Sequence, residues 1–350
     1  MKVVVVTSDV PFVTGGHRII AEALVSQLNA YGHDAILWCT PQNRFGRQFS
    51  AYLANYFTDL GETGSGDKID AVISLRYPSY AVKHYFHICW LNHRAREYYD
   101  LWEQFKSKIS FANKIKESIR RTAIHWIDRY FLKNNVKKLY AQSINIQKRL
   151  QKWGKIKSEV LYPPAIPRNY CFKEYGDFIF VPARLHPLKR ISLGIDALAK
   201  MKNTNISMII VGEGPEYNNL IALIKECNLE KRVQLLGWVA EDTLLDLYAR
   251  CLAVFYGPLN EDYGLVTLEA FSSRKALITC QDSGGTNELL EHGKSGFLVN
   301  SEPDHIALAF DAVSDKLIAE KQGNYAYSKS AEFSWEKTIA TLLQLKTSNE

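Results

Sequence analysis

The sequence lacks a long apolar run, a paired-cysteine motif and a secretory leader. A membrane-spanning helix needs about 20 consecutive apolar residues, whereas the apolar start at residues 3–6 is too short even for a signal-peptide core. The six cysteines are scattered, with no CxxC pair, so neither a disulfide framework nor a metal site is expected. These absences predict a cytoplasmic protein with reduced thiols.

Two kinds of nucleotide-recognition motif are also missing. The GxGxxG fingerprint of dinucleotide-binding folds does not occur. No zinc-finger or RNA-binding pattern accompanies the basic residues. We therefore expect neither a classical dinucleotide-binding loop nor a nucleic-acid partner.

The pattern that is present is an alternation of strands and helices. Of the 350 residues, 47% are hydrophobic, which suits two domains of ordinary size. Short apolar runs typical of buried parallel strands recur between helical patterns, for example at 2–7, 87–91, 178–182 and 253–256. The alternation predicts an α/β protein with two Rossmann-like parallel-sheet domains facing a central interdomain cleft. We place the N-terminal domain at 1–168, the C-terminal domain at 169–333 and a last helix at 334–350 that packs back on the N-terminal domain.

Charge is unevenly distributed along the chain. Residues 106–157 contain fifteen lysines and arginines against Glu117 and Asp128, a net charge of +13, which leaves −7 for the remainder of a chain whose total is +6. Aromatic residues such as Phe111 and Trp126 are interleaved with these cations. This combination favours contact with an anionic membrane surface. A solvated helical face is the alternative.

The most informative stretch is GPLNEDYGLVTLEA, residues 257–270. It follows a short apolar strand and contains Glu261 and Glu269 around a loop that turns into a helix. A helix start offers backbone N–H groups to a phosphate, whereas carboxylates suit sugar hydroxyls. The stretch alone is equally compatible with a nucleotide sugar and with a solvated acidic loop.

Several other polar or glycine-rich segments also follow predicted strands. They are Gly15-Gly16, His93, Arg184 with Lys189, Gly212–Gly214 and Gly284-Gly285. Ligand sites of open α/β sheets lie at the carboxyl ends of strands, so these segments can contribute to one site. Taken alone, His93 is equally explained as a capping or packing histidine.

Five motifs together resemble the retaining glycosyltransferases of family 4, which have the GT-B fold. The motifs are VPARLHPLKR at 181–190, VGEGPE at 211–216, LGWV at 236–239, EDYGLVTLE at 261–269 and SGGTNELLEHGKSGFLV at 283–299. WLNHRAREYYDL at 90–101 is similar to the acceptor-side segment of a bacterial branch of the family. FSWEK at 333–337 resembles its last helix, which crosses back onto the first domain.

The resemblance implies a role for each matching residue of the donor site. Arg184 and Lys189 would hold the donor diphosphate and offset its charge as it leaves. Glu261 would contact the transferred sugar, and Glu269 the ribose hydroxyls. The remaining donor-binding residues would be Gly15, Gly16, Gly212, Glu213, Gly214, Val239, Tyr263, Gly264, Leu265 and Val266.

The resemblance also implies how the acceptor side works. His93 would lie near the transferred sugar, where it orients the sugar and stabilises charge while the leaving phosphate oxygen takes the acceptor proton. Arg96 and Tyr99 would bind the acceptor or simply hold this loop. No DxD motif occurs, consistent with catalysis that needs neither a metal nor another cofactor.

The resulting hypothesis is a hexosyltransferase of cell-surface polysaccharide synthesis, peripheral on the inner face of the plasma membrane. It would move a sugar from a UDP- or GDP-sugar to a glycan acceptor, which we expect to be lipid-linked, as in lipopolysaccharide precursors. Two alternatives stay open, a sugar-nucleotide epimerase of GT-B fold and a non-catalytic nucleotide-sugar-binding partner.

Overall fold

The computed structural model describes residues 1–9, 15–42 and 45–345. The chain divides into two compact units, unit 1 (Met1–Pro163 with the segment from Ser334) and unit 2 (Pro164–Phe333). The boundary lies before the predicted position at 168. The reason is that the Arg168 side chain packs within unit 2, where it forms ion pairs with Glu241 and Glu269.

Within the described residues, unit 1 is built on a six-stranded sheet with the order β2-β1-β3-β4-β5-β6. Every neighbouring pair is parallel. The central strand β1 carries the run Val3–Val6, which is at most 3% exposed, because a strand covered on both faces needs apolar residues at every position. The strands are β1 (Lys2–Asp9), β2 (Asp34–Pro41), β3 (Ala71–Ser74), β4 (His87–Leu91), β5 (Lys138–Ala141) and β6 (Glu159–Val160).

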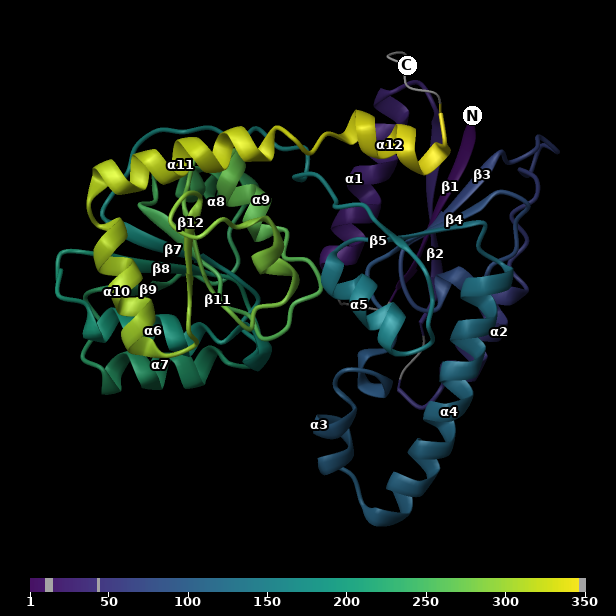
Figure 1. Cartoon of the computed structure of the whole chain (residues 1–350), viewed down its shortest axis with the longest axis horizontal. Helices are drawn as coiled ribbons and strands as arrows, with labels where there is room; N and C mark the ends of the chain where they lie inside the picture. Colours follow the sequence, from purple (N-terminus) through teal and green to yellow (C-terminus); the bar gives the residue numbers. More distant parts are fainter. Residues whose placement is uncertain (10–14, 43–44, 346–350) are drawn as a thin grey trace. The chain divides into compact units, whose positions relative to one another are not determined.

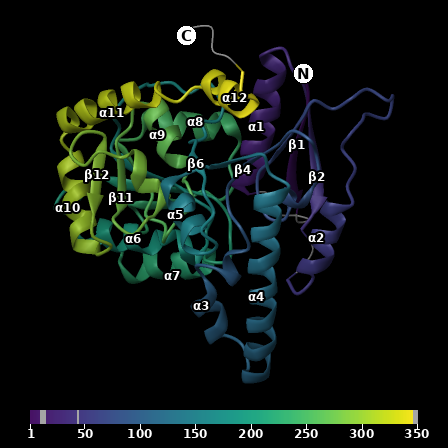
Figure 2. The same cartoon turned by 45° about the vertical axis from the view of Figure 1, so that its right-hand side comes forward.

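Helices α3 and α4 form a hairpin that extends beyond the sheet of unit 1 (Figures 1 and 2). The last helix, α12, contacts α1, and its Trp335 ring lies edge-on to Trp90 with the ring centroids 6.3 Å apart. It ends at Leu343, so it is shorter than the predicted 334–350, and 346–350 lie outside the described residues. The helices are α1 (Gly16–Ala30), α2 (Gln48–Tyr56), α3 (Trp102–Ser107), α4 (Phe111–Asn134), α5 (Ile144–Lys152) and α12 (Trp335–Leu343), with 3-10 turns η1 (Ser79–Ala81) and η2 (Arg96–Tyr98).

Unit 2 has a second parallel sheet with the order β12-β11-β10-β7-β8-β9. Counted from β7, this is the strand order of the Rossmann fold. The strands are β7 (Phe178–Pro182), β8 (Ser207–Val211), β9 (Val233–Leu235), β10 (Ala253–Phe255), β11 (Leu277–Cys280) and β12 (Gly296–Val299).

Helices cover both faces of the sheet in unit 2. Helices α6, α7 and α10 lie on one side and α8, α9 and α11 on the other (Figure 1). They are α6 (Ile191–Lys200), α7 (Tyr217–Glu226), α8 (Glu241–Arg250), α9 (Val266–Ser272), α10 (Pro303–Val313) and α11 (Lys316–Ser330), with 3-10 turns η3 (Pro187–Lys189) and η4 (Gly285–Leu289).

The two parallel sheets confirm the predicted α/β architecture, but some helices differ from expectation. No sequence pattern marked helices α2 and α11, and the glycine pair Gly284-Gly285 leads into the 3-10 turn η4. Helix α11 lacks an apolar stripe because its buried positions include Gln322 and Gly323. A Cβ atom on Gly323 would lie 2.1 Å from the Arg274 carbonyl oxygen, so this close helix contact requires glycine.

Across the described part of the chain, no helix is both long and apolar enough to cross a bilayer.

Candidate functional site

The strand order of unit 2 reverses between its neighbouring central strands β7 and β10. Ligands of open α/β sheets bind outside the carboxyl ends of the strands at such a reversal. Here β7 continues into residues 183–190, and β10 continues into the acidic stretch 257–270. The two segments that carry the strongest sequence motifs therefore emerge side by side.

An ion pair between Lys189 and Glu261 joins these two segments. The Lys189 Nζ lies 2.8 Å from a Glu261 carboxylate oxygen and donates to the Tyr256 hydroxyl at 2.7 Å. Burial by itself lowers the pKa of Lys189. Attraction to Tyr256 and Glu261 outweighs this effect of burial, so the pKa of Lys189 is raised. Burial also raises the pKa of Tyr256 to about 12. Lys189 is thus a charged ammonium, held where it can exchange its carboxylate partner for a phosphate.

Arg190 connects three loops around this ion pair. Its guanidinium donates to the carbonyl oxygens of Gly257 (2.9 Å) and Pro258 (3.0 Å). It also forms two bonds to the Asp282 carboxylate, at 2.7 and 2.6 Å. Its own backbone is left-handed, with φ of 49°, a conformation that is uncommon outside glycine and often marks a functional site. Arg190 ends the motif at 181–190 but was not among the predicted site residues.

The backbone of the acidic loop pairs with the second glycine loop. The Glu261 N–H donates to the Ser283 carbonyl at 3.0 Å, and the Gly285 N–H donates to the Glu261 carbonyl at 2.9 Å. Gly264 has φ of 86°, and a Cβ there would lie 2.6 Å from the Thr286 hydroxyl oxygen. The backbone of Glu261 is therefore fixed by main-chain bonds through both its N–H and its C=O.

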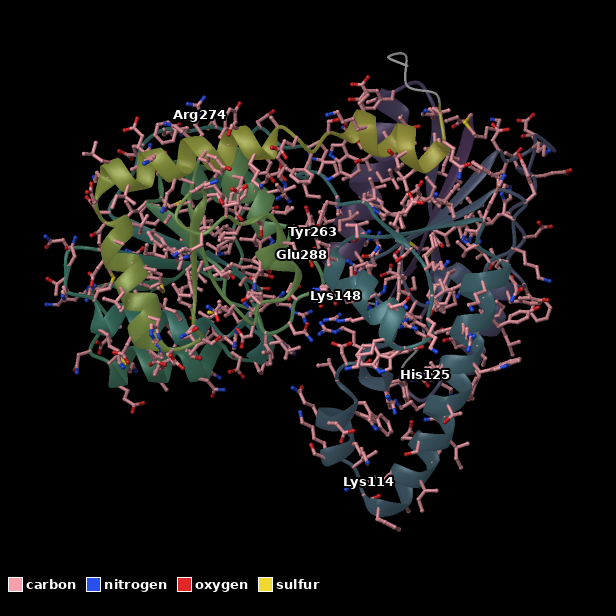
Figure 3. All side chains as sticks on the ribbon, viewed as in Figure 1. Lys114, His125, Lys148, Tyr263, Arg274 and Glu288 are labelled. Atoms are coloured by element: carbon pink, nitrogen blue, oxygen red, sulfur yellow. The ribbon has the colours of Figure 1, made fainter. Side chains whose placement is uncertain are left out.

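The helix that follows the acidic loop begins where the sequence predicts. Helix α9 starts at Val266, directly after Gly264 and Leu265, while Tyr263 is buried. Figure 3 labels Tyr263 next to Glu288 of η4. Leu265 and Val266 are half-buried, which leaves this turn accessible to a ligand.

The glycines after β8 allow another close approach of backbones. Gly212 and Gly214 have φ of 135° and 157°, and Cβ atoms there would lie 2.2 Å from the carbonyl oxygens of Ala183 and Leu185. Any side chain would separate the β8 loop from the β7 loop. Glu213, between the two glycines, is exposed, and its carbonyl accepts from the Leu185 N–H at 2.9 Å.

Arg184 and Val239 lie at the rim of unit 2. Arg184 is exposed and forms no ion pair within the ranges that the structure describes. Its charge is one cause of the lowered pKa of His186, after burial. Val239 is half-buried in the loop after β9, next to Trp238, which is 73% exposed.

Glu269 lies in α9 within a cluster of aromatic hydroxyls. It accepts hydrogen bonds from Tyr248 at 2.8 Å and from Tyr170 at 3.4 Å, and it pairs with Arg168 at 3.1 Å. Burial raises the pKa of Glu269, and Arg168 opposes that shift. After burial, the negative charges of Glu261 and Glu269 both help to raise the pKa of Tyr256. The three partners of Glu269 are absent from the predicted site, because no local motif marks them.

In unit 1 the glycine pair opens α1, as predicted. Gly15 is the N-cap and Gly16 the first helical residue. The following His17 ring lies within 2.9 Å of the Arg76 guanidinium, which also donates to Gln42 at 2.6 Å. Burial, aided by the charge of Arg76, lowers the pKa of His17 to about 3. The ring is therefore neutral at pH 7.

His93 follows β4 and lines a small pocket of unit 1. Its Nδ1 lies 2.8 Å from the Arg94 carbonyl oxygen. Because a carbonyl only accepts, Nδ1 carries the proton, and the lone pair of the neutral ring is on Nε2. His93 also contributes to the lowered pKa of His17, after burial and Arg76. The pocket is lined by Leu91, Asn92, His93, Arg94, Arg96, Tyr99, Asp100, Ile146, Arg149 and Leu150.

The two other residues predicted on this segment differ in their surroundings. Arg96 lines the pocket and pairs with Asp100 at 2.6 Å, which Arg149 also approaches at 3.3 Å. Tyr99 is 4% exposed, and its hydroxyl donates to the buried Asp128 at 2.6 Å. This geometry fits the alternative that Tyr99 holds the loop. The partner of Tyr99 is Asp128, which was predicted only as one of two acidic residues in the basic region.

No group of three or more metal-ligating side chains occurs among the residues that the structure describes.

A family comparison matches one part of the chain. Residues 165–329 match the family described as glycosyl transferases group 1. A curated relative from Campylobacter jejuni, N-acetylgalactosamine-N,N'-diacetylbacillosaminyl-diphospho-undecaprenol 4-alpha-N-acetylgalactosaminyltransferase, is 30% identical over 155 residues, 43% of this chain and 42% of that protein. N-acetyl-alpha-D-glucosaminyl L-malate synthase of Bacillus anthracis is 28% identical over 134 residues, 38% of this chain and 34% of the relative. The chain thus spans less than half the length of these relatives.

Solved structures match nearly the whole chain. Anabaena Alr3699/HepE, solved with UDP and glucose, superposes with a TM-score of 0.70 at 16% identity, covering 98% of this chain and 99% of that one. The lipopolysaccharide outer core galactosyltransferase WaaB superposes with a TM-score of 0.69 at 15% identity, covering 99% and 100%. At this identity the likeness concerns the fold. The chain therefore has the GT-B fold, and its residues 165–329 are similar to the group 1 glycosyl transferases.

Proposed function

We propose that this protein is a retaining glycosyltransferase that moves a hexose from a UDP- or GDP-sugar to a glycan acceptor. The observation that carries the proposal is the Lys189–Glu261 pair at the strand reversal of unit 2, with Tyr256 on the same ammonium. A cation and a carboxylate at one ligand site suit a phosphate next to a sugar.

The chemistry requires charge stabilisation during departure of the nucleoside diphosphate. The bond between the sugar C1 and the phosphate oxygen breaks, and a bond from the acceptor oxygen to C1 forms on the same face. The acceptor proton passes to the leaving phosphate oxygen. Arg184 and Lys189 supply positive charge to that phosphate, while Glu261 binds sugar hydroxyls and Glu269 the ribose. His93 orients the sugar, and no metal is needed in this scheme.

The acceptor we propose is lipid-linked, in cell-surface polysaccharide synthesis. The Campylobacter relative, which matches this chain at 30% identity, acts on a diphospho-undecaprenol substrate by its name. The Arg96–Asp100–Arg149 group beside His93 gives the pocket an excess of positive charge, which suits an acceptor carrying phosphate.

Helix α4 supports the proposed peripheral contact with an anionic membrane. Five of its apolar side chains are 48–78% exposed. At about 100° of rotation per residue they fall within one sector about 100° wide along the whole helix. Lys114 and Lys116 flank this stripe on its two sides, as in helices that lie on anionic bilayers. The five are Phe111, Ile115, Ile119, Trp126 and Tyr130.

A ligand screen tests the donor proposal. UDP or GDP, or one of their sugars, should raise the melting temperature, because a ligand that binds only the native state stabilises it. Protein that neither binds, hydrolyses nor transfers from any member of a broad panel would refute the proposal. Formation of an epimer without acceptor would favour the epimerase alternative. A non-catalytic partner would require that His93→Ala and Glu261→Ala leave glycan assembly in cells unchanged, while loss of the protein blocks it.

Sedimentation with vesicles of phosphatidylglycerol and phosphatidylcholine tests the membrane proposal. Ile119→Ser with Trp126→Ser should weaken binding, and added salt should weaken it further. Phe57→Ser is the matched control, because Phe57 is 75% exposed but lies outside α4. Binding that is equal in all three proteins, or absent, would contradict this part.

A further inference from the structure

Helix α4 has a second face, opposite its exposed apolar stripe, and that face is buried and carries polar as well as apolar side chains. Its buried residues include Glu117 and Asp128, two carboxylates in a segment otherwise rich in cations. A buried carboxylate is costly unless it is hydrogen-bonded. Each of the two must therefore have partners, and the partners show what the helix holds.

Glu117 and its neighbours on α4 hold Tyr98. The Tyr98 hydroxyl donates to Glu117 at 2.8 Å. The Tyr98 carbonyl oxygen lies 2.8 Å from both the Arg121 Nε and the His125 Nε2. Successive turns of α4 thus hold both the side chain and the main chain of this residue. Figure 3 labels His125 about midway along α4.

Asp128 holds Tyr99 together with two further tyrosines. The Tyr99 hydroxyl donates at 2.6 Å, and Tyr52 and Tyr80 donate to the other carboxylate oxygen. The Tyr99 ring also stacks on His125, with ring centroids 4.2 Å apart and planes within 6°. Asp128 is fully buried, and burial raises its pKa while the three hydroxyls oppose that shift.

The segment held in this way is the one that carries His93. The loop of residues 93–99, here called the His93 loop, has two ends. At one end His93 and Arg96 line the pocket. At the other Tyr98 and Tyr99 are fastened to α4, and Tyr99 lines the pocket as well. The Arg94 guanidinium lies 3.8 Å from the centre of the Tyr99 ring. Displacement of Tyr99 would therefore disturb the pocket wall.

We propose that Asp128, acting through Tyr99, is a positioning residue that sets the His93 loop for the acceptor. The proposal rests on the function proposed above and extends it, since it makes α4 part of the acceptor-binding apparatus and not only of its membrane contact. Asp128 itself touches no reacting atom.

Matched tyrosine variants test this proposal. Tyr99→Phe and Tyr80→Phe each remove one hydroxyl from the same carboxylate, but Tyr80 lies in η1, outside the His93 loop. The probe acceptor is a polyprenyl-diphosphate-linked N-acetylhexosamine, with the nucleotide sugar found in the ligand screen. Tyr99→Phe should raise the KM for acceptor about tenfold more than the KM for donor, as expected for loss of one hydrogen bond to a charged group. Tyr80→Phe should change the two KM values alike.

Amide hydrogen exchange provides a readout that is independent of activity. Exchange of peptides covering 93–101 should quicken about tenfold in Tyr99→Phe and remain unchanged in Tyr80→Phe. Equal effects of the two variants on exchange and on acceptor KM would overturn the proposal, because Asp128 would then stabilise unit 1 in general. Absence of hydrolysis and transfer in the wild type, with the loop-specific exchange difference intact, would instead refute the proposed function. Asp128→Asn, which keeps one acceptor oxygen for the hydroxyls, should recover part of the loop protection that Asp128→Ala loses.

Discussion

Unit 1 and unit 2 share a parallel-sheet architecture but differ in how they arrange charge. In unit 2, cations at the strand ends pair with carboxylates of neighbouring loops, as in Lys189–Glu261 and Arg190–Asp282. In unit 1, the region 106–157 buries its two carboxylates beneath tyrosine hydroxyls and leaves most cations exposed. The paired charges suit a site that exchanges protein partners for a ligand. The unpaired surface charges suit a surface that attracts a large anionic partner.

The family match follows the same division. It covers 165–329 and thus lies within unit 2. The function proposed above assigns the donor to unit 2, and the acceptor and the membrane contact to unit 1, which the family match does not reach. Four experiments test this contrast.

The largest effect is expected from removing the paired cation of unit 2. Lys189→Ala should lower kcat/KM for sugar transfer about 100- to 1,000-fold, the usual cost of one group that stabilises developing charge. The measurement is nucleotide release in a coupled assay. Lys200→Ala is the matched control, since Lys200 pairs with Asp304 on the exposed surface of unit 2. An equal loss of kcat/KM in both variants, or no loss in Lys189→Ala, would contradict the special role of the paired cation in unit 2.

The second effect concerns the arginine that connects the loops. Arg190→Ala removes bonds to two carbonyl oxygens and to Asp282, so unit 2 should lose about 2 kcal/mol of unfolding free energy. Urea unfolding monitored by fluorescence measures the loss, and the KM for donor should rise as well. Arg250→Ala, whose partners Glu174 and Asp246 are about half-exposed, should change stability little. An unchanged midpoint for Arg190→Ala would contradict the assigned role.

The third effect is the loss of stability of unit 1 in acid. Burial lowers the pKa of His87 in β4 to about 3, below the unfolded value of about 6.5. Between these values the unfolded chain binds more protons, so stability contributed by neutral His87 is complete above pH 6.5 and declines as the pH falls toward 3. At pH 5 the loss is about 2 kcal/mol.

The variant for this test is His87→Gln, which can keep the hydrogen bond to Ser74 (2.8 Å in the wild type) but does not titrate. Melting temperatures of wild type and variant are compared between pH 7 and pH 4.5. The melting temperature of the variant relative to that of the wild type should rise as the pH falls. A difference that stays constant would contradict the lowered pKa of His87.

The smallest effect is expected from single surface cations of α4. Lys114→Gln and Lys116→Gln should each weaken binding to anionic vesicles about fivefold at low salt, since one lysine near such a surface contributes about 1 kcal/mol. Vesicle sedimentation measures it, and the effect should disappear at about 0.5 M salt. Lys225→Gln, an exposed lysine of α7 in unit 2, is the control. A similar loss of vesicle binding in Lys225→Gln would mean that the cations of α4 have no special role in membrane binding.

The sequence predicts the two sheets and the strand ends well because these features depend on local pattern. Strands β4 and β7 begin and end at the predicted residues, since buried parallel strands are marked by continuous apolar runs. Helix α11 could not be predicted in this way, because its contact depends on Gly323 and on a carbonyl of a distant residue.

The candidate site shows the same limit. Lys189 and Glu261 were identifiable from motifs, and the structure brings them within hydrogen-bond distance. Their partner Tyr256 and the connecting Arg190 were missed, because each acts through contacts with residues about 67 positions away in the chain. Asp128 was missed for a different reason. It precedes Arg129, which is charged and exposed, and only the fold shows that Asp128 points inward.

The exposed stripe on α4 also affects how this protein should be handled. In water, five large apolar side chains on one helix provide a surface by which molecules can adhere to one another or to plastic. Yields and activities measured in plain buffer should therefore decline as the protein is concentrated, and a mild detergent or small lipid discs should restore them. Solution conditions are consequently a variable of every assay described above.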